Sequence, residues 1–395
     1  MDNLTRTAEQ LPVSLSRRLE PFVLLIVLGL FFGYIGSTMG VVNMFDTLFA
    51  TAHDLLLNTV FFIMGITVLT GAFSHVLVEF GLIRIMEKLL APLMRPIFNL
   101  PGRSALAALM TFFSDNPAII SLATDRRFNK GFKAYELFSL ANFGTAFGMG
   151  MIVVTFMSTL NLGNGSSSVG PALIGLAGAL VGGIVSTRLM QRLCKPIVGE
   201  EEIDIDFQGN AGEVLDIELS GKPQDSAWLR LLNAMLDGGK SGVGLGMAII
   251  PGVLIISSIV MLLTFGPSEH GYTGGAYEGV KLLPALGNHF SWLLSGLFGF
   301  EHAELIAFPV TSLGAVGAAM STLPPLIAKG MITGNEIAVF TAMGMCWSGY
   351  LSTHTAMMDT LKRRELTSKA LLAHTVGGLC AGISAHYLFL AVQLF

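Results

Sequence analysis

The chain has 395 residues, of which 52% are hydrophobic and only 13% are charged, and its net charge is −4. Soluble domains carry about 25% charged residues, so most of this chain must face lipid or the interior of a helix bundle, which excludes a soluble enzyme. The negative net charge leaves no basic surface for nucleic acid. Three widely spaced cysteines without a CxxC pair indicate neither a disulfide framework nor a zinc site.

Several apolar runs are long enough to cross a bilayer core, which takes about 20 residues. The first run is too long for the core of a signal peptide, and we expect it to be a retained span. In chain order the runs are 21–39, 56–80, 134–158, 171–190, 242–265, 335–358 and 370–393. Two further apolar stretches, 103–125 and 303–328, are interrupted by polar residues and prolines. Because broken backbone at membrane depth must be buried in protein or line a cavity, we expect re-entrant hairpins there.

The basic residues predict an orientation in the membrane. Arg6, Arg17 and Arg18 precede the first span and place the N-terminus in the cytoplasm. If the spans are counted from this cytoplasmic N-terminus, the predicted cytoplasmic loops are 81–103, 124–133, 188–241 and 359–369. Most lysines and arginines lie in those loops, whereas the outer segments hold only Lys281 and Lys329. We therefore expect a multi-pass protein of the bacterial inner (cytoplasmic) membrane.

Two stretches of the chain follow one plan of amphipathic helix, span, amphipathic segment, interrupted hairpin and span. The first comprises 44–55, 56–80, 82–99, 103–125 and 134–158, and the second comprises 228–238, 242–265, 280–300, 303–328 and 335–358. AYELFSLANFG (134–144) aligns with GNEIAVFTAMG (334–344), which pairs Glu136 with Glu336 and Gly144 with Gly344. The charge pattern predicts that the two hairpins enter the membrane from opposite sides. The fold class predicted is an all-α polytopic membrane protein with inverted-topology repeats, two re-entrant hairpins and an elevator-transporter-like arrangement.

This plan divides the chain into four parts. Residues 1–43 form an N-terminal segment with the first span, and 44–198 form the first repeat with one extra span. Residues 199–227 are acidic and are expected to be a cytoplasmic linker. Residues 228–395 form the second repeat with a final span.

The first hairpin has Ser114, Asp115, Asn116 and Pro117 at its centre. Proline cannot donate a backbone hydrogen bond and disfavours helix in the residue before it, so the chain should unwind there. An unwound tip exposes backbone carbonyls and helix ends, and the three polar side chains add ligands for a sodium ion, a proton or a polar solute. The alternative is a turn in which Asp115 or Asn116 only caps the helix that begins at Pro117.

The second hairpin begins with Glu301, His302 and Glu304, which lie within one helical turn of one another. A carboxylate beside a histidine could carry a proton or bind a cation. The alternative is a charge cluster at the outer membrane surface. Thr311 and Ser312 would form the tip.

The spans behind the hairpins add further polar candidates. Helical spacing puts Asn142 and Thr145 on one face of the first of these spans. The candidates in the second are Ser348, Thr353, His354 and Thr355. His354 could couple protons, or it could be a hydrogen-bonded core histidine. Glu136 and Glu336 lie near the starts of spans, where a carboxylate interacts favourably with the helix dipole. We therefore interpret them as helix-dipole partners rather than as ligands of an ion or solute.

Three segments carry a resemblance to a known family. They are LLAPLMRPIFNLPGRSALAALMTFFSDNPAI (89–119), LNAMLDGGKSGVGLGMAIIPGVLI (232–255) and FEHAELIAFP (300–309). These segments resemble nucleoside-recognition (Gate) domain membrane proteins, which include concentrative nucleoside transporters, the permease part of ferrous-iron transporters and spore maturation proteins. Two Gate-like units would be fused over 44–361. The resemblance implies a hairpin-bearing unit that moves against an oligomeric scaffold. Ser114, Asp115 and Asn116 replace the glutamine-threonine-glutamate signature of nucleoside carriers, so the substrate does not carry over.

These observations predict a cation-coupled secondary transporter of a small polar solute that forms a homo-oligomer in the lipid bilayer, with nucleoside-like compounds as one candidate class of solute. No cofactor is expected beyond sodium or a proton as coupling ion, because GGKSGVGLG (238–246) lacks the glycine that a P-loop needs at Ala234. One alternative is a flippase-like translocator of a lipid-linked or amphipathic substrate. The other is a membrane partner protein without transport. An enzyme is not expected, since no nucleophile–base pair or metal-ligand spacing stands out.

Overall fold

The computed structural model describes residues 15–163, 165–203 and 226–394. Arg6 and most of the predicted linker 199–227 lie outside these residues. In the described part, all regular structure is helical apart from two isolated β-bridges. The prediction of an all-α polytopic membrane protein is confirmed.

Six helical stretches within the described residues are long and apolar enough to cross a membrane. They are Leu19–Met39, Val41–Glu79, Ala134–Thr159, Val169–Val198, Ala227–Thr264 and Arg364–Gln393. The predicted span 335–358 is not among them, because its second part, YLSTHTAMMDT (350–360), is too polar. The chain also leaves the helix at 347–349 and forms α19 (Gly334–Cys346) and α20 (Tyr350–Thr360).

Each half begins with one long helix where the sequence predicted an amphipathic helix followed by a span. In the first half, α2 (Val41–Asp54), the π-helical η1 (Leu55–Val60) and α3 (Phe61–Glu79) are continuous. In the second half, α12 (Ala227–Gly252), the π-helical η2 (Val253–Ser257) and α13 (Ser258–Thr264) are continuous. A π-helical segment inside a long α-helix often marks a functional site.

The two long helices cross in antiparallel directions through a glycine contact. A Cβ on Gly71 would lie 2.5 Å from the carbonyl oxygen of Gly238, and one on Gly242 would lie 2.5 Å from the carbonyl carbon of Thr67. The Thr67 hydroxyl also donates a 2.7 Å hydrogen bond to the carbonyl of Gly242. Small residues let the two backbones touch, which is how helices associate in lipid. Each long helix is the first element of its own half. In an inverted repeat, equivalent helices run in opposite directions, and these two helices do so.

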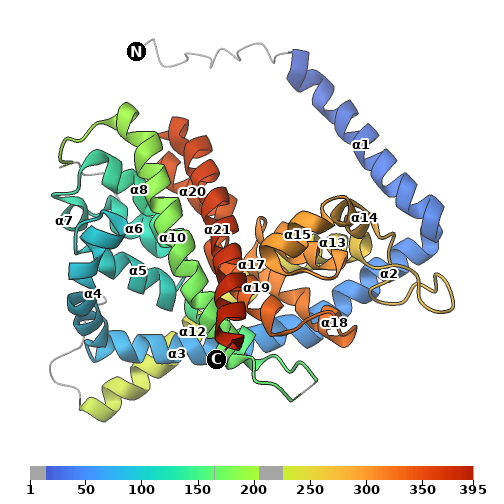
Figure 1. Cartoon of the computed structure of the whole chain (residues 1–395), viewed down its shortest axis with the longest axis horizontal. Coiled ribbons are helices and arrows are strands. Elements are labelled where there is room, and N and C mark those ends of the chain that lie inside the picture. Colours follow the sequence, from blue (N-terminus) through green and yellow to red (C-terminus); the bar gives the residue numbers. More distant parts are fainter. Residues whose placement is uncertain (1–14, 164, 204–225, 395) are drawn as a thin grey trace, which may run out of the picture.

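A second glycine contact joins the helices that close the two halves. Figure 1 shows α10 (Val169–Val198) and α21 (Thr367–Gln393) side by side through the middle of the molecule. A Cβ on Gly182 would lie 2.6 Å from the carbonyl oxygen of Gly377 and 2.6 Å from the Cβ of Ala381. The hairpin elements of the first half lie on one side of this pair, and most of those of the second half lie on the other (Figure 1).

The remaining helices keep the same order in both halves. The first half has α4 (Leu82–Phe98), α5 (Ser104–Phe113), α6 (Pro117–Thr124), α7 (Arg126–Asn129), α8 (Ala134–Thr145) and α9 (Gly150–Thr159). The second half has α14 (Leu282–His289), α15 (Ser291–Phe298), η3 (Ala303–Ile306), α16 (Ala307–Ser312), α17 (Val316–Ser321) and α18 (Leu323–Ala328), followed by α19 and α20. Outside the two repeats, α1 (Leu15–Met39) comes first and η4 (Arg364–Leu366) precedes α21.

The aligned glycines have equivalent roles in the two halves. A Cβ on Gly144 would lie 2.6 Å from Cγ1 of Ile119 in α6, and one on Gly344 would lie 3.2 Å from the ring of Phe308 in α16. Each glycine thus lets its own hairpin pack against the helix that follows it. All residues of α8 are buried, and so is α19 from Asn335 to Cys346, so these two helices form the centre of the core.

Candidate functional site

Four breaks in the helices meet around one cavity. Two are the hairpin tips, 114–116 between α5 and α6 and 313–315 between α16 and α17. The other two interrupt the helices behind the hairpins, at 146–149 between α8 and α9 and at 347–349 between α19 and α20. Pro117 is the first residue of α6 and forces the first break, because it has no N–H to donate.

The central cavity has a volume of about 330 Å³. Its polar lining comes from Asp115, Asn116, Ser348, Ser352 and Thr353, and α12 closes one side with apolar residues. Small-molecule sites of about 300–1,000 Å³ with few polar groups on an apolar wall are the common pattern in proteins. The remaining lining residues are Pro117, Ile120, Met149, Leu245, Ala248, Ile249, Gly252, Gly314, Ala315, Val316, Gly317, Gly349 and Ala356.

The carboxamide of Asn116 connects the two halves at this cavity. Its Nδ2 donates to the Ser348 hydroxyl oxygen at 3.1 Å and to the Asp115 carboxylate at 3.2 Å. The Ser348 hydroxyl in turn donates to the backbone carbonyl of Thr145 at 3.3 Å. These contacts join the first hairpin tip to both helix breaks.

Two glycines make room for that carboxamide. A Cβ on Gly148 would lie 2.6 Å from Asn116 Nδ2, and a Cβ on Gly349 would lie 2.7 Å from the same atom. Both distances are far shorter than real Cβ contacts. The carboxamide therefore fits only because both helix breaks present glycine to it.

Three helices of eight or more residues begin at the cavity. The N-cap residues Asn116 of α6, Met149 of α9 and Gly349 of α20 all line it. Free backbone N–H groups and the positive end of the helix dipole occur at such ends. The cavity thus offers hydrogen-bond donors from the backbone beside the carboxylate of Asp115. The sequence argument missed the glycine and serine contributors, Gly349 and Ser352 among them, although the glycines in FGMG (147–150) and WSGY (347–350) were a usable signal.

The structure brings only some first-half candidates to this cavity. Asp115 and Asn116 line it, and Ser114 is exposed at the same tip. The hydroxyl of Thr145 donates to the Ala141 carbonyl at 2.5 Å, so only the Thr145 carbonyl takes part. Asn142 lies elsewhere, where its amide donates to Ser186 and to the Ala370 carbonyl.

Most second-half candidates also lie away from the cavity. The hydroxyls of Thr311 and Ser312 donate to carbonyls of their own helix at 2.6 Å and 2.9 Å, as serine and threonine inside helices commonly do. The side chains at the start of this hairpin and one on α20 point elsewhere: Glu301, His302 and Thr355 are exposed, and Glu304 is half-buried. Ser348 and Thr353 are the candidates of this half that line the cavity.

His354 faces the helix pair at the centre of the molecule rather than the cavity. Its Nδ1 lies 2.6 Å from the Tyr350 carbonyl, and its ring centroid lies 4.5 Å from that of His374 in α21. The described residues contain no cluster of three or more metal-ligating His, Cys, Asp or Glu side chains.

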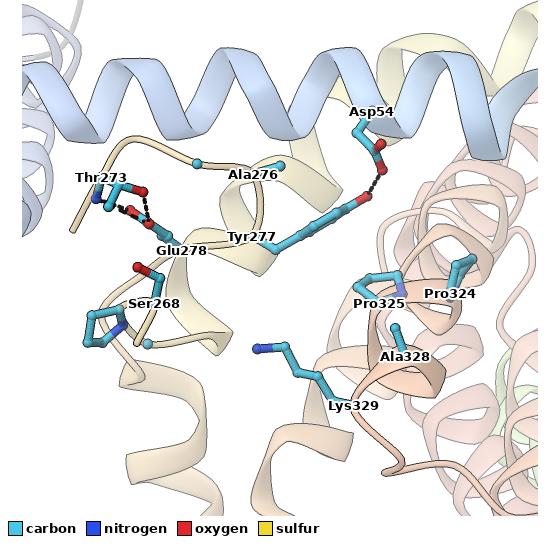
Figure 2. Close-up of a pocket in the computed structure, with 13 residues that line it drawn as sticks. Asp54, Ser268, Thr273, Ala276, Tyr277, Glu278, Pro324, Pro325, Ala328 and Lys329 are labelled. Atoms are coloured by element: carbon cyan, nitrogen blue, oxygen red, sulfur yellow. Dashed lines mark hydrogen bonds between the residues drawn. The ribbon is translucent and has the colours of Figure 1, made fainter. Parts of the chain in front are cut away.

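A second cavity of about 540 Å³ lies between α18 and the loop 265–281 that follows α13 (Figure 2). Asp54, Tyr277, Glu278 and Lys329 contribute its titratable side chains, and Ser268 and Thr273 add two hydroxyl groups. It shares no lining residue with the central cavity.

Glu136 and Glu336 serve equivalent capping roles. A side-chain oxygen of Glu136 accepts from the backbone N–H of Lys133 at 3.0 Å, and one of Glu336 accepts from that of Thr333 at 2.8 Å. This is the N3 position of a capping box, which satisfies one free donor at the helix start. The interpretation of both residues as helix-terminus partners agrees with this geometry.

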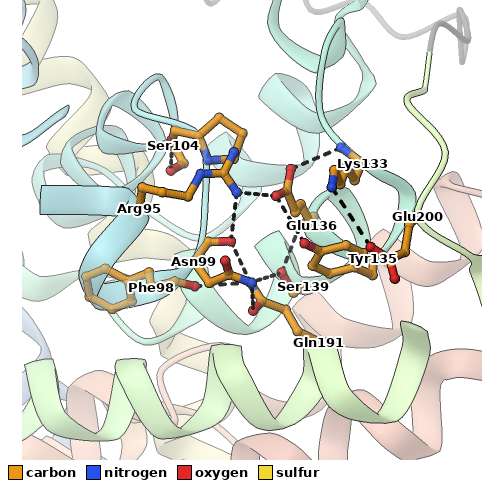
Figure 3. Close-up of polar contacts among 11 residues, drawn as sticks. Arg95, Phe98, Asn99, Ser104, Lys133, Tyr135, Glu136, Ser139, Gln191 and Glu200 are labelled. Atoms are coloured by element: carbon orange, nitrogen blue, oxygen red, sulfur yellow. Dashed lines mark hydrogen bonds and ion pairs between the residues drawn. The ribbon is translucent and has the colours of Figure 1, made fainter. Parts of the chain in front are cut away.

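Glu136 also anchors α4 to the hairpin unit (Figure 3). The fully buried Glu136 carboxylate forms an ion pair with Arg95 near the end of α4. Next to it, Asn99 donates to the side-chain oxygen of Gln191 in α10 at 3.1 Å, and Gln191 donates to the Ser139 hydroxyl at 3.3 Å. The network joins α4, α8 and α10.

We expect Glu136→Ala to lower the free energy of unfolding by about 1–3 kcal/mol, because it removes a helix cap and a buried carboxylate that is hydrogen-bonded to a half-exposed arginine. The melting temperature of the purified protein would measure this. Glu365→Ala is the control, since Glu365 is an exposed partner of Arg363 and its loss should cost about 0–1 kcal/mol. Equal melting temperatures for the two variants would contradict the anchoring role of Glu136.

Comparison with known proteins agrees with this architecture. Residues 55–180 match the Gate family model, which is described as nucleoside recognition. That range contains the first hairpin and both residues of its polar tip, Asp115 and Asn116. The predicted resemblance to Gate-domain membrane proteins is confirmed.

A curated relative and two solved structures show what the chain is similar to. It is 34% identical over 94 residues to the sporulation integral membrane protein YlbJ of Bacillus subtilis, and the match covers 23% of each chain. The transporter CNTnw in an outward-facing state matches 96% of this chain and 85% of its own, with a TM-score of 0.51 and 15% identity. The inward-facing, substrate-bound state of CNTnw matches 94% of this chain and 86% of its own, with a TM-score of 0.50 and 14% identity. At these identities the likeness shows a shared fold.

The curated relative is described as an integral membrane protein and not as an enzyme, in agreement with the prediction of a non-enzymatic membrane protein. The fold is therefore that of a multi-pass, transporter-like membrane protein.

Proposed function

We propose that the protein is a cation-coupled secondary transporter of a small polar solute and that the central cavity is its binding site. The observation that carries this proposal is the meeting of two hairpin tips and two helix breaks around one polar cavity, in a fold shared with CNTnw over nearly the whole chain. Broken helices that meet between repeats are where secondary transporters bind their substrates. The polar lining favours this function over translocation of a lipid-linked substrate.

The chemistry of the lining defines the solute. Backbone N–H groups at the starts of α9 and α20 suit carbonyl or hydroxyl oxygens, and the carboxylate of Asp115 suits a donor group. Leu245 and Ile249 of α12 form an apolar wall opposite. A solute with polar edges and a flat apolar face, such as a nucleoside or nucleobase, fits this division.

The coupling ion would bind at the first hairpin tip. The Ser348 hydroxyl lies 3.5 Å from Asn116 Oδ1 and 3.3 Å from the Thr145 carbonyl oxygen, and Asn116 Nδ2 donates to the Asp115 carboxylate at 3.2 Å. Carboxylate, amide, hydroxyl and backbone oxygens are the ligands that sodium finds at broken helices, and the same carboxylate could carry a proton instead.

The scaffold in this proposal is the crossed pair of long helices, and the moving unit contains the two hairpins with α8 and α19. Two Gate-like units fused in one chain would build a homo-oligomer in the bacterial cytoplasmic membrane. The N-terminus would face the cytoplasm, and the hairpins would enter from opposite sides. Ser114 would then lie at the first hairpin tip beside the central cavity, and Glu301, His302 and Glu304 would lie at the entrance formed by the start of the second hairpin.

A thermal-shift screen tests the proposal with and without sodium, across pH, and against nucleosides, nucleobases and lipid phosphates. We expect sodium or low pH together with a nucleoside-like solute to raise the melting temperature of the wild type, because a ligand that binds only the folded state stabilises it. Asp115→Asn should remove the ion-dependent part of the shift. Asp237→Asn is the matched control, because Asp237 is an exposed partner of Lys240 on α12.

Two outcomes would count against this proposal. An undiminished ion-dependent shift in Asp115→Asn would move the ion site away from the first hairpin. A shift produced by lipid phosphates alone would favour the flippase-like alternative.

A further inference from the structure

The cavity between α18 and the loop 265–281 contains side chains of both charges, but only the acidic ones accept hydrogen bonds from the protein (Figure 2). One carboxylate oxygen of Asp54 accepts from the Tyr277 hydroxyl at 2.5 Å, and the other accepts from Asn58 Nδ2 at 2.7 Å. Glu278 accepts from the backbone N–H and hydroxyl of Thr273 at 2.9 Å and 2.6 Å. Both acids are therefore already satisfied by the protein.

Hydrogen bonding keeps Glu278 ionised. Burial alone would raise the pKa of this carboxyl group, but the hydrogen bonds from Thr273 and Gly274 outweigh burial and hold the pKa below its usual range. The buried carboxylate fixes the loop in place and has little capacity left for a ligand.

The basic side chains of the cavity are not balanced in this way. The Lys329 ammonium lies 4.2 Å from the ring centroid of Phe265, and in the described part of the chain no carboxylate lies within ion-pair distance of it or of Lys281. Figure 2 shows Lys329 pointing into the space between Ser268 and Tyr277. Burial lowers the pKa of Lys329, the charge of Lys281 lowers it further, and Glu304 does not offset them.

Lys281 lies along the edge of the same cavity. A Cβ on Gly266, which lines the cavity, would lie 3.2 Å from the Lys281 ammonium nitrogen. Lys281 and Tyr277 both have positive φ, at 51° and 62°. Such angles are uncommon for residues other than glycine, and strained residues of this kind cluster at binding sites.

We propose that this cavity is a second ligand site, which binds a phosphate group through Lys329 with support from Lys281. An exposed ammonium without a carboxylate partner at a cavity of about 540 Å³ suits an anion, and lysine is a common phosphate ligand. Pro267, Pro324, Pro325 and Ala328 give the cavity apolar walls for the organic part of the molecule. A soluble phosphate ester and a lipid headgroup share this chemistry.

Because of the position of this site, a bound ligand would contact two parts of the fold at once. One wall is the loop that follows the long helix of the second half, and the other is the arm α18 of the second hairpin. A bound phosphate compound would hold the hairpin arm against the scaffold. This inference concerns a cavity separate from the central one and does not depend on the solute transported.

The test measures binding to the purified full chain in phosphate-free detergent, by thermal shift and titration. The probes are glycerol 3-phosphate for a soluble source and short-chain phosphatidylglycerol for a lipid source. We expect one of them to stabilise the wild type, and we expect Lys329→Gln to bind it about tenfold or more weakly, the effect of losing one charge-assisted hydrogen bond. Lys329→Arg should keep binding, and Lys281→Gln should weaken it less than Lys329→Gln does.

Two control variants make the result specific. Lys130→Gln removes an exposed lysine near α8 and should bind the probe like the wild type. Asp115→Asn should also bind it normally, so a failure of the transport proposal would not be confused with a failure here. Binding of neither probe to the wild type, or equal binding to the wild type, Lys329→Gln and Lys281→Gln, would overturn the proposal.

Discussion

Gly148→Ala is expected to abolish tight ligand binding at the central cavity while the protein still folds. The added Cβ would lie 2.6 Å from Asn116 Nδ2, so the carboxamide must leave its position beside Ser348. Overpacking of this kind costs about 1–3 kcal/mol, which corresponds to roughly 5- to 150-fold in a dissociation constant if the cost falls on the bound state. The measurement is the affinity for the sodium and nucleoside-like probes that stabilise the wild type.

Gly170→Ala is the matched control, because a Cβ at Gly170 on α10 would have no neighbour within 4 Å. A double-mutant cycle with Asn116→Ala then isolates the cause. Once the Asn116 carboxamide is removed, Gly148→Ala should cost little further stability. A full additional loss in the Asn116→Ala background would show that the Gly148 methyl group acts on another neighbour.

Gly238→Ala is expected to cause a large loss of stability, because the added methyl group would meet the backbone of the other long helix. Its Cβ would lie 2.7 Å from the carbonyl carbon of Gly71 and 2.8 Å from the Cα of Ala72. These neighbours are backbone atoms and cannot turn aside, so α3 and α12 must separate. We expect a loss of about 1–3 kcal/mol or more in the free energy of unfolding, measured as a lower melting temperature.

Gly244→Ala on the same helix is the control for that measurement. No atom lies within 4 Å of its added Cβ, and alanine has a higher helix propensity than glycine, by about 1 kcal/mol. Its stability should be unchanged or slightly higher. Equal melting temperatures for the two variants would contradict the close approach of α3 and α12.

The first hairpin tip was predictable from local sequence. Pro117 breaks the helix wherever the chain runs, because a proline has no N–H to donate and restricts the residue before it. Asp115 and Asn116 therefore had to lie at a break, and the structure places them on the central cavity. The pairing of Glu136 with Glu336 was also local, because a capping box involves residues only three positions apart.

The partners of the other polar residues could not be predicted in the same way. Asn142 and Ser348 both stand in apolar helical runs, but Asn142 faces Ser186 and α21, whereas Ser348 faces Asn116 across the cavity. Helical spacing indicates which residues share a face, and it does not indicate which helix lies opposite that face. Thr311 and Ser312 show the same limit, since their hydroxyls bond to their own helix.

The sequence by itself determined the membrane class, most of the spans and the order of elements in the two halves. These follow from composition and from runs of apolar residues, which are properties of the chain read one segment at a time. Only the tertiary structure decided that the long helices cross at Gly71 and Gly238, that the span 335–358 breaks at 347–349, and that Gly148 and Gly349 enclose Asn116. Those features depend on close contacts between residues far apart in the chain, where the fit of one methyl group determines which arrangement is allowed.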